Sequence, residues 1–258
     1  MDRLEATIER VGPDRVPFVL ITIMNNSGGG QPVSMANIRA TSRLLKRYGI
    51  PLVFDACRFA EHCFFSKERE PGYADVPVRE IARSLFSPGD GCLMSAKKDG
   101  LVNIGGFLGV NDPPWVQAIT DHLILVEGFP SYGGLARRHF VAMVRGLDEV
   151  LDKDDLRFRI SQVRYLGKLL ARGGVPILHP IGGHAVSLNA REFLPRLEQH
   201  RFPAQALAVA LYREYGIRGV EIGSALFERR NPVTGRRSLQ NWNWSGWLFR
   251  AASIRIRI

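Results

Sequence analysis

The sequence predicts an α/β protein built around an open sheet. Residues 16–24 form an apolar run rich in β-branched and aromatic side chains, which is typical of a buried strand. An amphipathic pattern follows, and residues 50–54 form a second apolar run, so strand, helix and strand alternate as in open α/β sheets. With 258 residues, 45% of them hydrophobic, the chain is long enough to bury the core of one large domain or of one and a half smaller ones.

Periodicity and the glycine and proline positions predict the other elements. The helix after the first strand begins near Pro32 and ends at Gly49, because proline suits a first helical turn and glycine ends a helix. We expect further strands at residues 91–96, 175–179 and 217–222, and further helices at residues 135–151, 156–172, 187–194 and 203–215.

Polar side chains mark the ends of the first three expected strands. Six of them lie at the end of a strand or shortly after it: Asn26, Asp55, Arg58, Ser95, Lys97 and Lys98. Open α/β sheets bind their ligands at the carboxyl ends of the strands. We therefore expect these residues to converge at one edge of the sheet.

These residue types suit a cofactor that carries an aldehyde, a ring nitrogen and a phosphate. A partly desolvated lysine beside a second cation is a good nucleophile and can hold an aldehyde as a Schiff base. Asp55 can pair with a pyridinium nitrogen, so that the ring acts as an electron sink, and Arg58 can reach a phenolate oxygen. Ser95 and Lys97 can hold a phosphate, because they bring a hydroxyl and a positive charge to one short turn.

Each motif also has a plain structural explanation. The pair Lys97 and Lys98 fits a solvated loop, and residues 55–58 fit a helix cap with a local ion pair. The three glycines at 28–30 fit a simple turn, since they match neither the dinucleotide-binding pattern nor the P-loop pattern. The order and spacing of the three motifs together favour the cofactor site.

Seven longer segments carry a more specific pattern: NSGGGQPVSMAN (26–37), FDACRFAE (54–61), MSAKKD (94–99), NIGG (103–106), EGFPSYGGL (127–135), GGHA (182–185) and FPAQAL (202–207). Together they resemble the β-eliminating lyases, the family of tryptophanase and tyrosine phenol-lyase. The resemblance covers about residues 1–235.

The resemblance implies pyridoxal phosphate (PLP) as cofactor and the α/β fold of the aspartate aminotransferases, PLP fold type I. Lys98 would bind the aldehyde and take the α-proton of the substrate, and Asp55 would pair with the pyridine nitrogen. Asn26 and Arg58 would face the phenolic oxygen of the ring. Ser95 and Lys97 would contribute to the phosphate site.

The resemblance also implies an aromatic amino acid as substrate. Ile222 stands where the phenol-lyases carry an arginine and tryptophanases an apolar residue, so the expected reaction splits tryptophan into indole, pyruvate and ammonia. An apolar residue at the end of a buried strand is equally well explained as core, and phenol-lyase activity is the less favoured alternative. Asn103 would contribute to a site for a monovalent cation, K⁺.

The resemblance divides the chain into three regions. Residues 1–155 would form a partial PLP-binding large domain with an incomplete sheet, and residues 156–235 a linking helix with part of the small α+β domain. Residues 236–258 form an atypical tail rich in Trp and Arg, in which no arginine matches the one that binds the substrate carboxylate in the family. A change of reading frame near Arg236 is our hypothesis for this tail, and a membrane-surface helix is the alternative.

Charge and composition argue against several kinds of partner. Seven arginines and no acidic residue follow Glu228, so residues 1–228 hold only three of the ten net positive charges and lack a nucleic-acid footprint. No apolar run approaches the roughly 20 residues that span a bilayer. The three cysteines form no C-x-x-C pair, which suits a cytoplasmic protein. The family resemblance implies a homo-oligomer, in particular a tetramer.

Two other functions remain open from the sequence. A non-catalytic lyase remnant is the first, because an α/β sheet that lacks strands and helices exposes an edge and an apolar face. Anion or nucleic-acid binding through the basic tail is the second.

Overall fold

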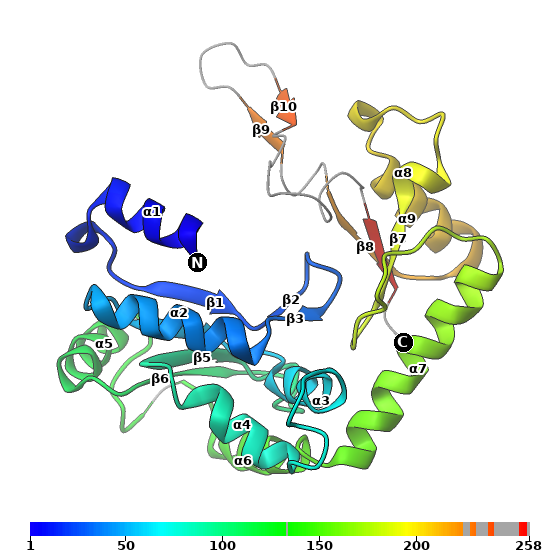
Figure 1. Cartoon of the computed structure of the whole chain (residues 1–258). Coiled ribbons are helices and arrows are strands. Elements are labelled where there is room, and N and C mark those ends of the chain that lie inside the picture. The colour runs from blue at the N-terminus through cyan, green and yellow to red at the C-terminus, as the bar shows by residue number, and fades with distance from the viewer. Residues whose placement is uncertain (133, 224–227, 231–236, 240–252, 257–258) are drawn as a thin grey trace. The chain divides into compact units, whose positions relative to one another are not determined.

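The structure, a computed structural model, describes residues 1–132, 134–223, 228–230, 237–239 and 253–256 (Figure 1). The chain forms two compact units. The first comprises Met1–Met24 and Pro32–Leu156, and the second comprises Asn25–Gln31 and Arg157–Ile258. Among the described residues, no helix is both long and apolar enough to cross a membrane.

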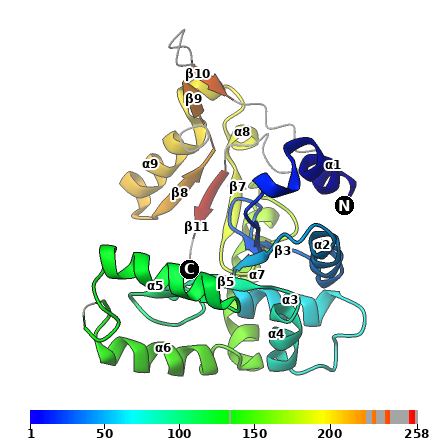
Figure 2. The same ribbon diagram turned by 90° about the vertical axis from the view of Figure 1, so that its left-hand side faces the viewer.

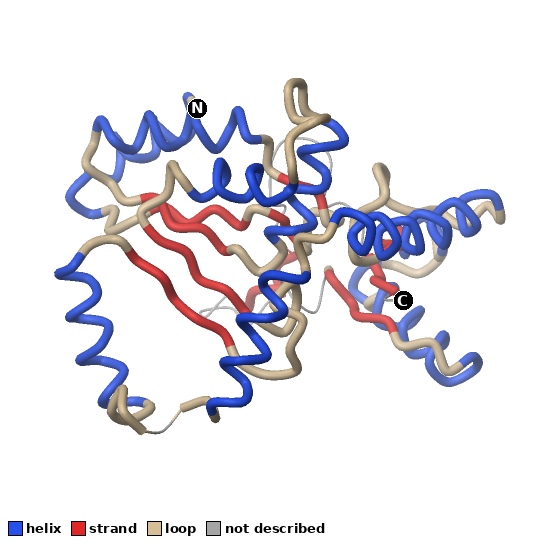
Figure 3. The backbone as a smooth tube through the Cα atoms, turned by 90° about the horizontal axis from the view of Figure 1, so that it is seen from below, coloured by secondary structure: helices blue, strands red, loops and turns tan. Residues whose placement is uncertain are grey.

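The first unit is built on a four-stranded sheet. Its strands are β1 (Val19–Thr22), β4 (Leu52–Asp55), β5 (Gly91–Ser95) and β6 (Gly106–Val110), in that spatial order. The first three are parallel, and β6 is antiparallel to β5. Figure 3 shows these strands side by side. Because parallel neighbours need a crossover, helices occupy the sequence between β1 and β4 and between β4 and β5.

Three crossover helices pack together on one side of this sheet: α2 (Met35–Arg47), α3 (Phe59–Arg69) and α4 (Val78–Phe86). Figure 2 shows them grouped on one side of the strands. The side chain of Ser34 caps α2 by accepting the Asn37 N–H at 3.1 Å. Phe54 of β4 is fully buried and makes an edge contact with Phe86 of α4, with ring centroids 6.2 Å apart.

The first unit contains four further helices outside the crossovers: α1 (Asp2–Val11), η1 (Pro13–Arg15), α5 (Pro113–Val126) and α6 (Arg137–Glu149). Helix α7 (Lys153–Arg172) begins in the first unit and continues in the second. The hairpin strands β2 (Met24–Asn25) and β3 (Gln31–Pro32) lie where the chain passes between the units.

The second unit has its own sheet and core. Strand β11 (Ser253–Ile256) lies between β7 (Val186–Asn189) and β8 (Gly219–Ile222) and is antiparallel to both. The other elements are α8 (Ala190–Phe193), η2 (Gln199–Arg201), α9 (Pro203–Tyr215) and the paired strands β9 (Glu228–Arg230) and β10 (Arg237–Leu239). The core gathers side chains of α7, β7 and α9, among them Val163, Leu188 and Leu207.

Two elements expected from the sequence are wrong, and the helix expected to begin near Pro32 begins at Met35, because Pro32 lies in β3 and Ser34 caps the helix. Residues 175–179 form no strand, because only an isolated bridge joins Ile177 to Leu188. Residues 187–194 form no continuous helix, because β7 occupies Val186–Asn189 before the short α8 begins. The Asn189 side chain explains the break, since it accepts the Glu192 N–H and caps α8. The tail at 236–258 lies mostly outside the described residues, so its origin stays a hypothesis, as does the three-region division.

Candidate functional site

The candidate site begins at the carboxyl ends of β4 and β5. Asp55 ends β4 and Ser95 ends β5, and these strands are parallel neighbours. Thr22, the last residue of β1, lies beside Asp55 and donates its hydroxyl to Asp55 Oδ2 at 3.5 Å. The strand ends therefore bring a carboxylate and two hydroxyl groups to one sheet edge.

Cys57 connects the turns that follow these two strands. Its N–H donates to Asp55 Oδ1 at 3.2 Å, and its Sγ accepts the N–H of Ser95 at 3.1 Å. Its carbonyl oxygen accepts the N–H of Asp99 at 3.3 Å. One residue thus fixes the Asp55 carboxylate, the end of β5 and the turn that carries the two lysines.

The pKa of the Cys57 thiol reflects its burial and the charges around it. Partial burial raises its pKa, the neighbouring Asp55 raises it further, and the Ser95 N–H and the charge of Lys98 lower it. The net direction is upward, so Cys57 accepts hydrogen bonds as a neutral thiol. The N–H of Asp99, the residue after Lys98, binds the carbonyl oxygen of Cys57, so the backbone brings Lys98 next to this turn.

Asp99 anchors the lysine turn to α3. Its carboxylate is buried, and its Oδ2 accepts the N–H groups of Ala60 at 2.8 Å and of Glu61 at 3.3 Å, at the start of the helix. A carboxylate at this position satisfies donors that an isolated helix leaves unpaired and interacts favourably with the helix dipole. The anchor fixes the residue that follows Lys98.

Helix α6 also packs directly on this turn. A Cβ at Gly146 would lie 2.0 Å from the carbonyl oxygen of Gly100, and a Cβ at Gly100 would lie 2.5 Å from that of Ala96. Neither backbone position has room for a side chain. The turn is therefore held from both sides, by α3 through Asp99 and by α6 through Gly146.

The site offers groups that suit an anion and a carbonyl compound. Lys98 is half-buried and Lys97 is exposed. Ser95 Oγ is buried and has no hydrogen-bond partner within the described parts of the chain, so this hydroxyl can serve a ligand. Arg58 is buried at the start of α3. A phosphate matches this combination of an available hydroxyl and nearby cations.

Two other residues proposed from the sequence belong to the second unit, and a third lies in a loop of the first unit. Asn26 and Ile222 belong to the second unit, Asn26 between β2 and β3 and Ile222 at the end of β8. Asn103 is exposed in the loop before β6. The structure thus gathers Asp55, Ser95 and Lys98 around Cys57, and the roles of all the proposed residues stay predictions.

Sequence reasoning gave Cys57 and Asp99 no role of their own. The residue types alone carry no signal for them, because both act mainly through bonds to backbone groups distant in the sequence. Their position inside the segments FDACRFAE and MSAKKD is the signal that points to them.

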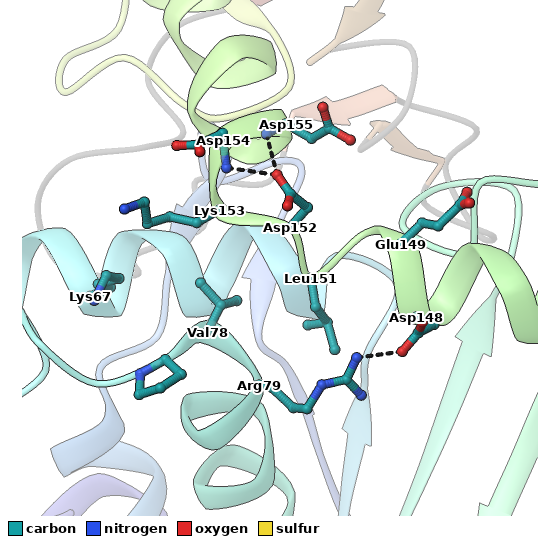
Figure 4. A pocket seen from close by; sticks show the side chains of 11 residues that line it. Lys67, Val78, Arg79, Asp148, Glu149, Leu151, Asp152, Lys153, Asp154 and Asp155 are labelled. Carbon is teal, nitrogen blue, oxygen red and sulfur yellow. Dashed lines mark hydrogen bonds and ion pairs between the residues drawn. The ribbon is translucent and has the colours of Figure 1, made fainter.

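A pocket of about 850 Å³ lies away from these residues, at the starts of α4 and α7 (Figure 4). Two of its acidic side chains have structural partners: Asp148 pairs with Arg79, and Asp152 caps α7 by accepting the N–H groups of Asp154 and Asp155. In the described part of the chain, no group of three or more His, Cys, Asp or Glu residues can hold a metal ion.

Comparison with known sequences places the chain among lyases. The family model described as beta-eliminating lyase matches residues 1–247, which extends past residue 235, where we expected the resemblance to end. The tryptophanase of Salinibacter ruber is 55% identical over 230 residues, covering 89% of this chain and 49% of the relative. The tyrosine phenol-lyase of Symbiobacterium thermophilum is 50% identical over 233 residues, covering 90% and 51%. The chain thus spans about half the length of the curated relatives it matches.

Solved structures confirm the predicted fold of the aspartate aminotransferase type. An archaeal O-phosphoseryl-tRNA(Sec) selenium transferase matches with a TM-score of 0.55 and 15% identity, over 99% of this chain and 50% of that one. A putative L-allo-threonine aldolase from Listeria monocytogenes matches with a TM-score of 0.53 and 18% identity, over 77% and 49%. At these identities the likeness concerns the fold alone.

Proposed function

Because the chain belongs to the β-eliminating lyase family, we propose that it forms the cofactor-binding part of a PLP-dependent lyase that acts on an aromatic amino acid. The observation that carries this proposal is the convergence of Asp55, Ser95 and Lys98 at the carboxyl ends of two parallel strands. Ligands of open α/β sheets bind at this position. Lys98 would bind the aldehyde of the cofactor, Asp55 its ring nitrogen and Ser95 its phosphate.

Each residue of the site has a separate role in this proposal. PLP, when bound, supplies an electron sink for the carbanion at the substrate's α-carbon. Lys98 Nζ would hold the cofactor and would take the α-proton of the amino acid. Asp55 would keep a proton on the ring nitrogen, and the hydroxyl of Ser95 with the charge of Lys97 would hold the phosphate.

Other residues contribute to the same proposal from outside this cluster. Arg58 and Asn26 would contact the phenolic oxygen, and Asn103 would ligate a monovalent cation such as K⁺. The cation proposal depends on the family resemblance, because Asn103 lies in an exposed loop.

We propose tryptophan as the substrate, with indole as the leaving group. Lys98 would take the α-proton, and the indole carbon must receive a proton before its bond to the β-carbon breaks. Ile222 supports this choice, because an apolar side chain suits indole better than a phenol. Curated relatives of both kinds, tryptophanases and tyrosine phenol-lyases, match this chain, so the choice depends on Ile222.

A second candidate is cofactor binding without turnover. The observation that favours it is that the chain spans only about half the length of the relatives it matches. The two candidates share the Lys98 site and differ in whether a product is released.

Product release separates these proposals. We would incubate the purified chain with PLP and either tryptophan or tyrosine, and measure indole, phenol and pyruvate. Indole and pyruvate in equal amounts support the tryptophanase-type reaction. Phenol instead of indole contradicts the role of Ile222, and cofactor binding without product supports the second candidate.

Two variants test which of the two lysines takes the α-proton. Lys98→Ala should abolish release, because it removes the amine that takes the α-proton, whereas Lys97→Ala should weaken cofactor binding and keep some release. A Lys98→Ala protein that keeps full indole release would contradict the assignment of the active site.

A further inference from the structure

A series of three hydrogen bonds joins a buried histidine to the backbone of Asp55. His62 of α3 is fully buried, and its Nε2 lies 2.6 Å from the carbonyl oxygen of Val33. The N–H of Val33 donates to the carbonyl oxygen of Ile23 at 2.9 Å, and the N–H of Ile23 donates to the carbonyl oxygen of Asp55 at 3.3 Å. We call His62, Val33 and Ile23 the His62 relay. All three residues belong to the first unit, as does Asp55.

The imidazole of His62 directs its polar contact at this relay. A carbonyl oxygen can only accept a hydrogen bond, so the ring must carry its proton on Nε2. The other ring nitrogen, Nδ1, is buried and has no hydrogen-bond partner within the described parts of the chain. A buried imidazole costs more free energy than an apolar side chain of similar size, unless a hydrogen bond compensates. The bond to Val33 supplies that compensation.

The relay also joins the two ends of a segment that belongs to the second unit. The chain leaves the first unit after Met24 and returns to it at Pro32. Proline has no N–H, so Val33 is the first residue after the return that can donate a backbone hydrogen bond. It donates to Ile23, the residue before Met24, and its carbonyl accepts from His62. His62 therefore holds the point at which the backbone closes.

The relay ends beside the weakest contact of Asp55. Among the described residues, Asp55 accepts the N–H of Ile23 at its carbonyl and the N–H of Cys57 at Oδ1, the latter at 3.2 Å. Its Oδ2 accepts the hydroxyl of Thr22 at 3.5 Å, which is long for a hydroxyl bond, so a small displacement removes it. Thr22 directly precedes Ile23 in the chain, so a shift of Ile23 moves Thr22 as well.

We propose that His62 is a positioning residue for Asp55, which acts through Val33 and Ile23. It keeps Ile23 and Thr22 in place, so that both carboxylate oxygens of Asp55 retain their donors. The consequence for the cofactor rests on the proposed function, in which Asp55 pairs with the ring nitrogen. The relay itself does not depend on that function.

Amide exchange at Ile23 tests the relay without any cofactor. His62→Leu removes the donor and keeps the apolar bulk, so exchange at Ile23, corrected for the global stability measured by urea unfolding, should become about tenfold faster. His62→Gln, whose amide N–H can reach the same oxygen, should restore most of the protection. Ile81→Val, a truncation at a fully buried position of α4, is the matched control and should leave the corrected rate unchanged.

Unchanged exchange at Ile23 in His62→Leu would overturn the proposal. If His62→Leu does not fold, His62→Asn takes its place, because its amide is too short to reach the carbonyl of Val33. It should also speed the exchange at Ile23, and an unchanged rate would again overturn the proposal.

A double-mutant cycle tests the link to Asp55, with PLP as the probe and its dissociation constant as the readout. His62→Leu and Thr22→Val should each weaken PLP binding about fivefold. The double variant should lose little more than either single variant, because both changes act on the same carboxylate. Additive losses would overturn the proposal, since they would mean that His62 acts elsewhere. If the unaltered chain binds no PLP, the proposed function fails, and exchange at Ile23 alone decides the role of His62.

Discussion

Asp99 is the residue on which the position of Lys98 depends most directly. Its buried carboxylate accepts two backbone N–H groups at the start of α3, and its own N–H binds the carbonyl of Cys57. Hydrogen bonds to a charged group are worth about 1.5–3 kcal/mol each in such surroundings. The Asp99 side chain therefore stabilises the turn through bonds to backbone groups of the protein.

We predict that Asp99→Asn lowers the free energy of unfolding by about 1–2 kcal/mol, because an amide oxygen accepts the same bonds without the charge. Urea unfolding followed by circular dichroism measures this loss. Asp148→Asn is the matched control, because the ion pair of Asp148 with Arg79 is exposed and should contribute less than about 1 kcal/mol. Equal losses in both variants would show that Asp99 is no anchor.

We predict that Cys57→Ala speeds hydrogen exchange at the Ser95 amide, because the Sγ that accepts this N–H is removed. Cys57→Ser restores an acceptor and should recover much of the protection. The measurement is amide exchange followed by mass spectrometry or NMR. An unchanged exchange rate at the Ser95 amide in Cys57→Ala would contradict the connecting role of Cys57.

The sequence predicted part of this site and missed the rest for a physical reason. Asp55 and Ser95 were found because strand ends can be located from apolar runs, and the structure places both at strand ends. The anchoring roles of Cys57 and Asp99 depend on backbone groups about 40 positions away in the chain, and no local pattern encodes such contacts.

Helix α3 contains a buried histidine that responds to acid. His62 is fully buried in this helix, and its Nε2–H donates to the carbonyl of Val33 at 2.6 Å. Burial lowers the pKa of His62, while the bond to Val33 and the charge of Glu70 oppose this shift. The folded protein therefore favours the neutral imidazole.

We predict that stability decreases as the pH falls below about 6.5, the ordinary histidine value, because the unfolded chain then binds a proton that the folded chain does not. His62→Gln should flatten this dependence between pH 7 and pH 5, and His122→Gln, at an exposed position of α5, should leave it unchanged. Urea midpoints at several pH values measure the slope. An unaltered slope in His62→Gln would assign the dependence to other groups.

The agreement between expected and observed elements was uneven, and α4 was missed although its buried residues Val78, Ile81 and Leu85 follow a helical spacing. Helix α9 spans Pro203–Tyr215, as its proline start and the glycine after it predict. Helix α3 was missed because its residues 59–66 are all buried, so it shows no amphipathic stripe. The strand β7 was taken as helix because Val186, Ser187 and Leu188 are all buried, and four residues are too few to establish a period.

The molecule combines the candidate site with exposed apolar side chains on the sheet of the first unit. It belongs to the β-eliminating lyases, spans about half the length of its curated relatives, and leaves apolar side chains exposed on the sheet face that carries Asp55. We expect cofactor binding to depend on the turn after β5. This expectation is the central one.

Reductive trapping of the cofactor tests that expectation most directly. The purified chain would be incubated with PLP and reduced with borohydride, and the modified peptides would be mapped by mass spectrometry beside Lys98→Ala and Lys97→Ala. The account predicts a label confined to Lys98, absent in Lys98→Ala and present in Lys97→Ala. A label scattered over exposed lysines, or one that persists in Lys98→Ala, would contradict it.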